Sequence, residues 1–322
     1  MAEKIVILDG FALNPGDLDW QPLQVLGDVH IHDRTPPDKI IQRSQGATCL
    51  LVNKVALTRE IMEALPDLRY IGILATGFNT VDMEAASERN IVVTNIPTYG
   101  TNSVAQHTAA LMLEFARGVC VHDEAVKNGE WTNNDDWCFA RQPMFELSGK
   151  TLGIVGIGRI GQAVARIGAA MGMKLIAHDK YWPDASVLTG LDVDRVAMDE
   201  LFAVSDVITL HCPLTPENYQ LVNSEKLNLM KSTALLLNTS RGALIDNQAL
   251  ADALNAGVIG GAGLDVLESE PPSIDNPLLT ARNCRITPHI AWYARESRSR
   301  LLQTAAENLS AFLKGRVENR VN

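Results

Sequence analysis

The sequence predicts an α/β fold, in which parallel strands alternate with helices in two doubly wound domains. Two observations carry this prediction. Apolar runs of strand length alternate with polar or helical stretches through both halves of the chain, a pattern typical of βαβ units. The second half also opens with a strand, a glycine turn and a helix in immediate succession (residues 151–180). A length of 322 residues is enough for about two domains.

The first hundred residues predict a small α/β domain. Its strand-like runs are residues 4–9, 48–53, 70–75 and 92–95. After the break at Pro97 and Gly100, we expect one long, buried apolar helix from Val104 to Val121. The following segment, residues 128–150, is expected to be irregular and contains Trp131, Trp137 and Phe139.

The second half predicts a larger sheet. Its strand-like runs are residues 152–155, 174–177, 206–211, 233–238, 260–265 and 283–288. Residues 296–314 have helical character and few helix breakers. Because this last helix follows the second domain, we expect it to return and pack on the first.

The composition is that of an ordinary globular protein, with 46% hydrophobic and 20% charged residues. A formal net charge of −10 argues against nucleic acid or an anionic membrane as a partner. No apolar run reaches the roughly 18 residues of a membrane helix, and the N-terminus does not resemble a signal peptide. The five cysteines show no metal-ligand spacing, which predicts reduced thiols and no metal site. We therefore expect a cytoplasmic protein that acts on a small molecule.

The glycine turn is the most specific motif. Gly156, Gly158 and Gly161 satisfy G-x-G-x-x-G between a strand and a helix. In dinucleotide-binding proteins these glycines allow the tight turn, the approach of the pyrophosphate and close helix–strand packing. The helix N-terminus presents its N–H groups to the phosphates. Asp179, 18 residues beyond Gly161, can accept hydrogen bonds from the adenosine ribose.

This arrangement predicts NAD as the cofactor. Two alternatives stay open at this point. One is a methyltransferase that binds its nucleoside at a similar turn, and the other is a glycine turn with a purely structural role.

Three further motifs follow strand-like runs, at residues 238–242, 265–271 and 287–290. Together they supply Arg241, the carboxylates of Glu268 and Glu270, and His289. An Arg fork can grip a substrate carboxylate through two hydrogen bonds. A protonated His can hydrogen-bond a keto oxygen and deliver a proton, and a nearby carboxylate favours its charged form. This set suits the reduction of a 2-keto acid.

With these motifs the chain resembles the D-isomer-specific 2-hydroxyacid dehydrogenase family over nearly its whole length, most closely its glycerate dehydrogenase and hydroxypyruvate reductase branch. The resemblance is carried by VTNIPTYGTNSVAQHT (93–108), GKTLGIVGIGRIGQAVA (149–165), HCPLTPEN (211–218), NTSRGALID (238–246), AGLDVLESEPP (262–272), DNPLL (275–279) and TPHIAW (287–292). It implies an oxidoreductase of two Rossmann-like domains. A flavodoxin-like substrate-binding (catalytic) domain would span residues 1–100 and 290–322, and an NAD-binding Rossmann domain residues 101–289.

The resemblance also implies roles for single residues. Arg241 would bind the substrate carboxylate, together with backbone N–H groups of Thr76 and Gly77. His289 would be the acid/base, oriented by Glu270, which is preferred to Glu268 because it precedes the proline as in the family motif. The expected cofactor neighbours are Val104, Gly156, Gly158, Arg159, Ile160, Gly161, Asp179, His211 (through its backbone), Cys212, Pro213, Thr239, Ser240, Asp265 and His289.

The implied reaction is NADH-dependent reduction of a small 2-keto acid to the D-2-hydroxy acid by a homodimer. Hydroxypyruvate to D-glycerate is expected, and also glyoxylate to glycolate. The alternatives are a different 2-hydroxy acid as product, a non-enzymatic NAD-sensing protein similar to the family's corepressors, and a phosphoglycerate dehydrogenase, which usually carries an extra C-terminal domain. One departure concerns the shape of the pocket. Several sequences of the glycerate dehydrogenase branch have an aromatic residue where Ala140 stands, and Arg141 follows it here.

Overall fold

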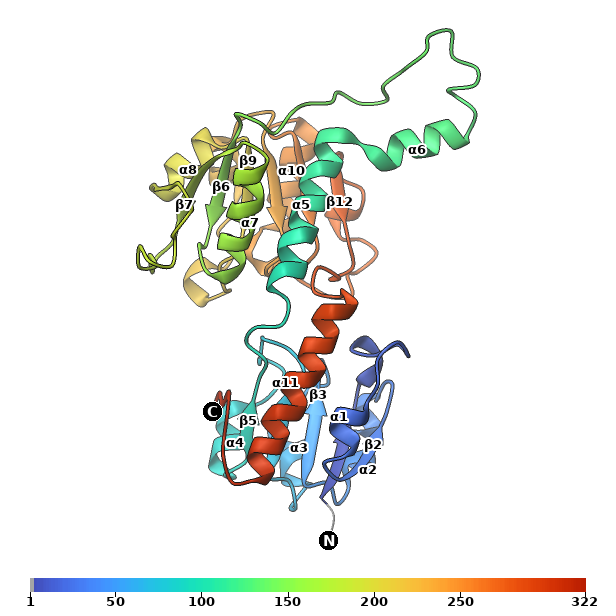
Figure 1. Cartoon of the computed structure of the whole chain (residues 1–322), viewed down its shortest axis with the longest axis vertical. Helices are drawn as coiled ribbons and strands as arrows, with labels where there is room; N and C mark the ends of the chain where they lie inside the picture. The colour runs from blue at the N-terminus through green and yellow to red at the C-terminus, as the bar shows by residue number, and fades with distance from the viewer. Residues whose placement is uncertain (1–2) are drawn as a thin grey trace. The chain divides into compact units, whose positions relative to one another are not determined.

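The computed structural model describes residues 3–322, which form two compact units (Figure 1). Unit 1 consists of the described residues up to Gly100 together with Trp292–Asn322, and unit 2 consists of Thr101–Ala291. Each unit is built around one parallel sheet. Two parallel sheets of this kind confirm the predicted fold class.

The sheet of unit 1 has the order β2-β1-β3-β4-β5, with every pair parallel. This order is the flavodoxin-like one. The strands are β1 (Lys4–Ile7), β2 (Asp28–Ile31), β3 (Cys49–Val52), β4 (Tyr70–Ile73) and β5 (Val92–Thr94). Strands β3 and β4 are buried on both faces, which explains why their sequences are continuous apolar runs and do not alternate.

Helices cover both faces of this sheet (Figure 1). One face carries α2 (Ile40–Ser44), α3 (Arg59–Glu63) and α4 (Met83–Glu88), and the other carries α1 (Gln21–Gln24) and α11 (Arg295–Leu313). The 3₁₀ helices η1 (Gly10–Ala12) and η2 (Pro37–Lys39) lie in the connections. The last helix of the chain thus belongs to the core of unit 1.

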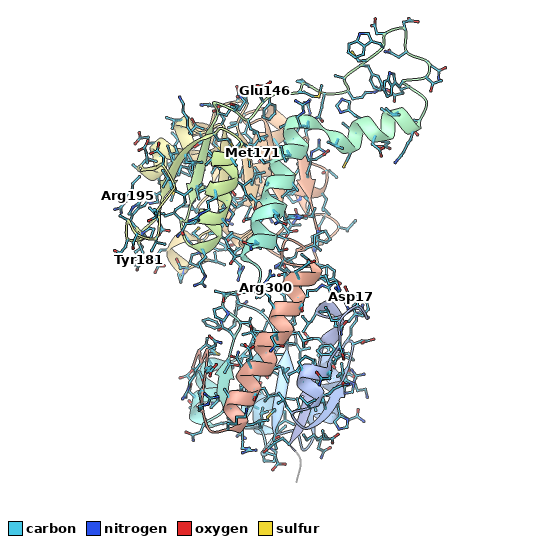
Figure 2. The ribbon with its side chains drawn as sticks, viewed as in Figure 1. Asp17, Glu146, Met171, Tyr181, Arg195 and Arg300 are labelled. Carbon is cyan, nitrogen blue, oxygen red and sulfur yellow. The ribbon has the colours of Figure 1, made fainter. Side chains whose placement is uncertain are left out.

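Polar contacts fasten α11 within unit 1. Arg298 makes two hydrogen bonds of 2.7 Å to the carboxylate of Asp17, and these bonds hold the pKa of that carboxyl below its usual value. Asn308 donates to the carbonyl of Asn95 at 3.0 Å. Figure 2 shows Asp17 and Arg300 near the same end of α11.

Unit 2 contains a seven-stranded sheet of order β12-β11-β10-β9-β6-β7-β8. Its strands are β6 (Thr151–Val155), β7 (Lys174–His178), β8 (Val193–Arg195), β9 (Val207–Leu210), β10 (Leu235–Asn238), β11 (Gly261–Leu264) and β12 (Cys284–Ile286). The order reverses between β6 and β9, and the crevice at such a switch point is where open α/β sheets bind their ligands.

Two helical layers bury the sheet of unit 2. One contains α5 (Thr101–Arg117) and α7 (Arg159–Ala170), and the other contains α8 (Met198–Val204), α9 (Ser224–Leu229) and α10 (Asn247–Ala256). Short 3₁₀ helices are η3 (Pro216–Asn218), η4 (Gly242–Leu244) and η5 (Pro277–Leu279).

The structure differs from the sequence prediction at one expected helix and at two strands that were not predicted. The single helix from Val104 to Val121 was wrong, because Gly118 adopts a left-handed conformation with φ of 58° and divides it into α5 and α6 (Val119–Lys127). Strands β2 and β8 were missed. Both are edge strands of three or four residues with polar, partly exposed side chains, so neither forms an apolar run.

Helix α6 and the irregular residues after it project from the body of unit 2 (Figure 1). We call residues 119–144 the arm. Its side chains include Trp131 and Trp137, which are 52% and 85% exposed. Within residues 3–322, no helix is both long enough and apolar enough to cross a membrane.

Candidate active site

The glycine turn follows β6 at the switch point of the unit 2 sheet. Gly156 has a φ of 94°, and a Cβ on it would lie 2.6 Å from the backbone nitrogen of Cys212. A Cβ on Gly161 would lie 2.1 Å from the carbonyl oxygen of Gly156. In contrast, a Cβ on Gly158 would meet nothing within 4 Å. The first and third glycines are therefore required by the protein's own packing, whereas Gly158 faces open space where a pyrophosphate can approach.

Asp179 lies just beyond the end of β7 and holds the glycine turn in place. Its carboxylate accepts the N–H of Ile157 and the N–H of Tyr181, each at 2.8 Å. Each carboxylate oxygen keeps further lone pairs for the hydroxyls of a ribose. Tyr181 is 79% exposed and lies at the edge of unit 2 (Figure 2). Together with the N-terminus of α7, this geometry fits an adenine dinucleotide.

The loop after β9 begins at His211. Its N–H donates to the carbonyl of Val155 at 2.7 Å, and its Nε2 lies 2.9 Å from the hydroxyl of Thr209. Burial lowers the pKa of His211 to about 3, so the imidazole is neutral. Burial also raises the pKa of the Cys212 thiol to about 11. Both side chains are thus unsuited to acid/base work near neutral pH, which agrees with a contribution of this loop through its backbone.

The loop after β10 carries Arg241. Asn238 shapes it by accepting the N–H of Ser240 at 3.0 Å and donating to the carbonyl of Arg241 at 2.8 Å. Ser240 also donates to the carbonyl of Cys212 at 2.6 Å, which joins this loop to the one after β9. Arg241 is exposed. Among the described residues its guanidinium makes one hydrogen bond, from Nη1 to the carbonyl oxygen of Ser240 at 2.8 Å. Its remaining donors can serve a substrate carboxylate.

Two predicted cofactor neighbours are connected through a residue that the sequence did not single out. The hydroxyl of buried Thr108 lies 3.0 Å from the hydroxyl of Thr239 and donates to the carbonyl of Val104 at 2.9 Å. Thr108 lies one turn after Val104 on α5, and this spacing was the only signal for it.

Glu270 and His289 form a close pair. The Nδ1 atom of His289 lies 2.6 Å from Oε2 of Glu270, and both side chains are about 30% exposed. The other oxygen of Glu270 accepts the N–H of Leu267 at 3.1 Å. Glu268 points elsewhere and accepts the hydroxyl of Tyr219 at 2.7 Å. The structure therefore brings Glu270 to His289, and the Nε2 atom of His289 has no partner among residues 3–322.

Asp265 fixes the segment that contains His289. This buried carboxylate accepts the hydroxyl of Thr287 at 2.6 Å and the N–H groups of Ile290 and Ala291 at 2.9 and 2.8 Å. The carbonyl of Asp265 accepts the N–H of His289 at 2.8 Å. These bonds hold His289 in a left-handed conformation with φ of 56°, which a non-glycine residue adopts only when its surroundings impose it.

The loops that carry Arg241 and Glu270 meet at Gly242. A Cβ on this glycine would lie 1.9 Å from the carbonyl carbon of Leu267, so no other residue fits. Thr76 and Gly77 belong to unit 1 and follow β4. The hydroxyl of Thr76 donates to Ile96 at 2.8 Å, and its carbonyl accepts the amide of Asn95 at 2.7 Å. Their backbone N–H groups have no partner within the described part of the chain.

Comparison with known proteins assigns the chain to a family. The family described as "D-isomer specific 2-hydroxyacid dehydrogenase, NAD binding domain" matches residues 109–291. The chain is also 50% identical over 322 residues to a hydroxypyruvate reductase of Blautia hydrogenotrophica, with 99% of each chain covered. The chain belongs to the D-isomer-specific 2-hydroxyacid dehydrogenase family.

Two further proteins are similar to this dehydrogenase over nearly its full length. A glycerate dehydrogenase of Methylorubrum extorquens is 37% identical, with 99% of each chain covered. A solved structure from Thermus thermophilus is 36% identical and superposes with a TM-score of 0.86, over 99% of this chain and 100% of that one. The match to the family's NAD-binding domain includes the glycine turn and Asp179. NAD, predicted from the sequence, is therefore confirmed as the cofactor of this domain.

Proposed function

We propose that this dehydrogenase reduces hydroxypyruvate to D-glycerate with NADH, and glyoxylate to glycolate as a second reaction. The observation that carries the proposal is the pair of His289 and Glu270, 2.6 Å apart, in a chain that is 50% identical over its full length to a hydroxypyruvate reductase. NADH, when bound, supplies the hydride. The residues of the chain supply the proton and position the substrate.

Each catalytic role follows from the contacts. Because Glu270 engages Nδ1 of His289, Nε2 is the atom that can donate to the keto oxygen and transfer a proton as the carbon is reduced. The carboxylate of Glu270 stabilises the imidazolium before the transfer. Arg241 grips the substrate carboxylate with its uncommitted donors, and the N–H groups of Thr76 and Gly77 are proposed as further donors to a carboxylate.

The cofactor preference rests on Asp179. We propose that it hydrogen-bonds the ribose hydroxyls of NADH and repels the 2′-phosphate of NADPH. A hydrogen bond to a charged group contributes about 1.5–3 kcal/mol, which corresponds to a preference of roughly ten- to over a hundredfold. Tyr181 and Trp182, two and three residues further on, offer no guanidinium for a phosphate.

Steady-state kinetics test the proposal. We would measure kcat/KM for hydroxypyruvate, glyoxylate, pyruvate and a branched 2-keto acid, each with NADH and NADPH. Hydroxypyruvate with NADH should give the highest value. A higher value for the branched acid would refute the substrate but leave the reaction class intact. Absence of turnover with every acid would favour an NAD-sensing binding protein of the corepressor kind.

We also propose that the protein is a cytoplasmic homodimer. The arm exposes large apolar side chains, among them Val119 (66%), Trp131 (52%) and Trp137 (85%), and several such side chains on one projecting segment are typical of an interaction surface. Arg141 is committed within the arm, where it pairs with Glu130 and donates its N–H to His122. The five cysteines are free thiols, as expected in a reducing compartment. Sedimentation at about twice the chain mass would support the dimer, and a monomer would refute it.

A further inference from the structure

A cavity of about 530 Å³ opens at the carboxyl edge of the unit 1 sheet. Its lining includes Asp9, Arg34 and Lys54, which come shortly after β1, β2 and β3. In the order β2-β1-β3 the connections diverge between β1 and β3, and doubly wound sheets bind ligands at such a switch point. The volume is typical of a small-molecule site. The lining contains none of Thr76, Gly77, Arg241, Glu270 and His289.

The only acidic group of the lining is already committed. The carboxylate of Asp9 accepts the N–H groups of Asn53, Lys54 and Val55 at 2.8, 2.6 and 3.0 Å. It therefore organises the loop after β3, and three donors offset much of its charge. Asp9, Arg34 and Lys54 together give the lining a net charge of +1, in a chain whose formal net charge is −10.

The two cations of the lining are available to a ligand. Neither Arg34 nor Lys54 forms an ion pair with a carboxylate anywhere in residues 3–322. The guanidinium of Arg34 is stacked 3.9 Å above the ring of Phe11, which restricts its position before any ligand arrives. The carbonyl of Arg34 is also held, by a hydrogen bond from Arg43. Such preorganisation lowers the entropy that a binding event would otherwise cost.

The rest of the lining is largely apolar. Ile40 and Ile61 come from α2 and α3, and Val55 comes from the loop after β3. A ligand that fits this cavity therefore combines one negative charge, placed at Arg34 and Lys54, with a short hydrocarbon body placed against the two isoleucines. A net charge of +1 is matched by a monoanion, whereas a phosphate dianion would leave one negative charge next to Asp9.

We propose that this cavity is a second anion site of the protein, which binds a small monocarboxylate with an apolar body. The site is separate in its residues from the ones proposed to reduce a 2-keto acid. The loop after β3, which lines this cavity, also supports the loop proposed to bind the substrate. Asn53 donates to the carbonyl of Leu74 at 2.9 Å, two residues before Thr76.

The test uses amide chemical shifts of the full-length protein during titration with sodium hexanoate. We expect saturable shifts at residues 34–40 and 53–61. The neutral analogue 1-hexanol and the short anion acetate should each bind at least about threefold more weakly. 1-Hexanol lacks the negative charge, and acetate lacks the longer hydrocarbon chain. Inorganic phosphate should also bind more weakly than hexanoate. Shifts confined to residues near Arg241 and His289, or equal binding of 1-hexanol and hexanoate, would overturn the proposal.

Variants test whether Arg34 and Lys54 bind the carboxylate of hexanoate. Arg34→Gln and Lys54→Gln should each weaken hexanoate binding about three- to fivefold, and both side chains are exposed, so the fold should persist. The matched control is Lys39→Gln, which removes an exposed cation from η2 that does not line the cavity. Hexanoate binding unchanged in both Arg34→Gln and Lys54→Gln, or equally weakened by Lys39→Gln, would contradict a defined site. Because the readout is binding, the result does not depend on whether hydroxypyruvate is the substrate.

Discussion

The two units contain the same kind of parallel sheet, but the loops at their carboxyl edges are held together differently. In unit 2 the loops meet backbone to backbone at Gly156 and Gly242, where a Cβ would lie 2.6 Å from Cys212 and 1.9 Å from Leu267, and side-chain bonds such as that of Ser240 to Cys212 add to these contacts. In unit 1 the loops are joined by hydrogen bonds, both between backbone groups, as from the N–H of Leu57 to the carbonyl of Thr80, and from polar side chains. Asp9 accepts N–H groups of the loop after β3, and Asn53 donates to the loop after β4.

This difference determines which substitutions each edge can accept. A backbone contact leaves no room for even one methyl group, so a substitution must displace a whole loop. A side-chain hydrogen bond can be removed alone, at a typical cost of about 1 kcal/mol. The edge that carries the glycine turn and the pair of His289 and Glu270 therefore has two positions that accept only glycine, whereas the side-chain hydrogen bonds of unit 1 can be removed one at a time.

The largest effect is expected at His289, where the fixed edge of unit 2 should carry the chemistry. His289→Ala should lower kcat about 10²- to 10⁴-fold, because general acid catalysis is lost. The affinity for NADH should stay within a few fold, since the glycine turn is untouched. Stopped-flow turnover and fluorescence titration of NADH measure the two quantities. Loss of NADH binding in step with turnover would mean that His289 has a structural role.

A companion variant separates orientation from proton transfer. In Glu270→Gln the ring of His289 loses the carboxylate that orients it through Nδ1, so kcat/KM should fall, by less than the roughly 10²- to 10⁴-fold expected for His289→Ala, while NADH affinity stays within a few fold. Steady-state kinetics and fluorescence titration of NADH measure the two quantities. An unchanged kcat/KM would remove Glu270 from the proposed mechanism.

The second prediction compares two glycines of unit 2. Gly242→Ala should destabilise the protein by about 3 kcal/mol, the upper range for overpacking, because the added carbon meets backbone atoms. Gly158→Ala should leave the unfolding temperature nearly unchanged, because a Cβ there meets nothing within 4 Å. It should nevertheless weaken NADH binding by roughly tenfold if the pyrophosphate approaches this backbone. Equal unfolding temperatures for the two variants would contradict the idea of a rigid backbone contact.

The third prediction concerns acid stability of the same edge. His211 has a pKa of about 3 in the folded protein because it is buried, whereas an unfolded histidine titrates near 6.5. The unfolded state therefore binds the proton first as pH falls, and stability is lost below about pH 6.5. At pH 5 this loss amounts to roughly 2 kcal/mol. His211→Gln should abolish that part of the decrease between pH 7 and pH 5, as measured by urea unfolding, and His30→Gln at an exposed position should not.

The smallest effect is expected in unit 1. Asn53→Ala removes the hydrogen bond to the carbonyl of Leu74 and leaves that oxygen without its partner. The free energy of unfolding should fall by about 1–2 kcal/mol, while NADH affinity is unchanged. Urea unfolding at neutral pH measures the loss. A loss larger than that of Gly242→Ala would reverse the comparison between the two edges.

The sequence by itself determined the features that depend on neighbouring residues. Buried parallel strands such as β3 and β4 are continuous apolar runs, and the glycine turn must lie between a strand and a helix to have its spacing. The fold class and the cofactor follow from such local patterns. Strands β2 and β8 escaped because an edge strand with polar residues has no pattern that distinguishes it from a loop. The division at Gly118 escaped because a single glycine is compatible with either a helix or a break.

Only the tertiary structure decided which residues meet across the loops. Glu268 and Glu270 are two positions apart and chemically identical, yet one accepts a hydrogen bond from Tyr219 and the other contacts His289. Thr108 reaches Thr239, and Asp265 holds the residues on both sides of His289. These partners lie between 19 and 131 positions apart in the chain. Their pairing depends on the order of strands in the sheet and on the close contact at Gly242, because a side chain can bind only what the packing of the backbone brings within about 3 Å.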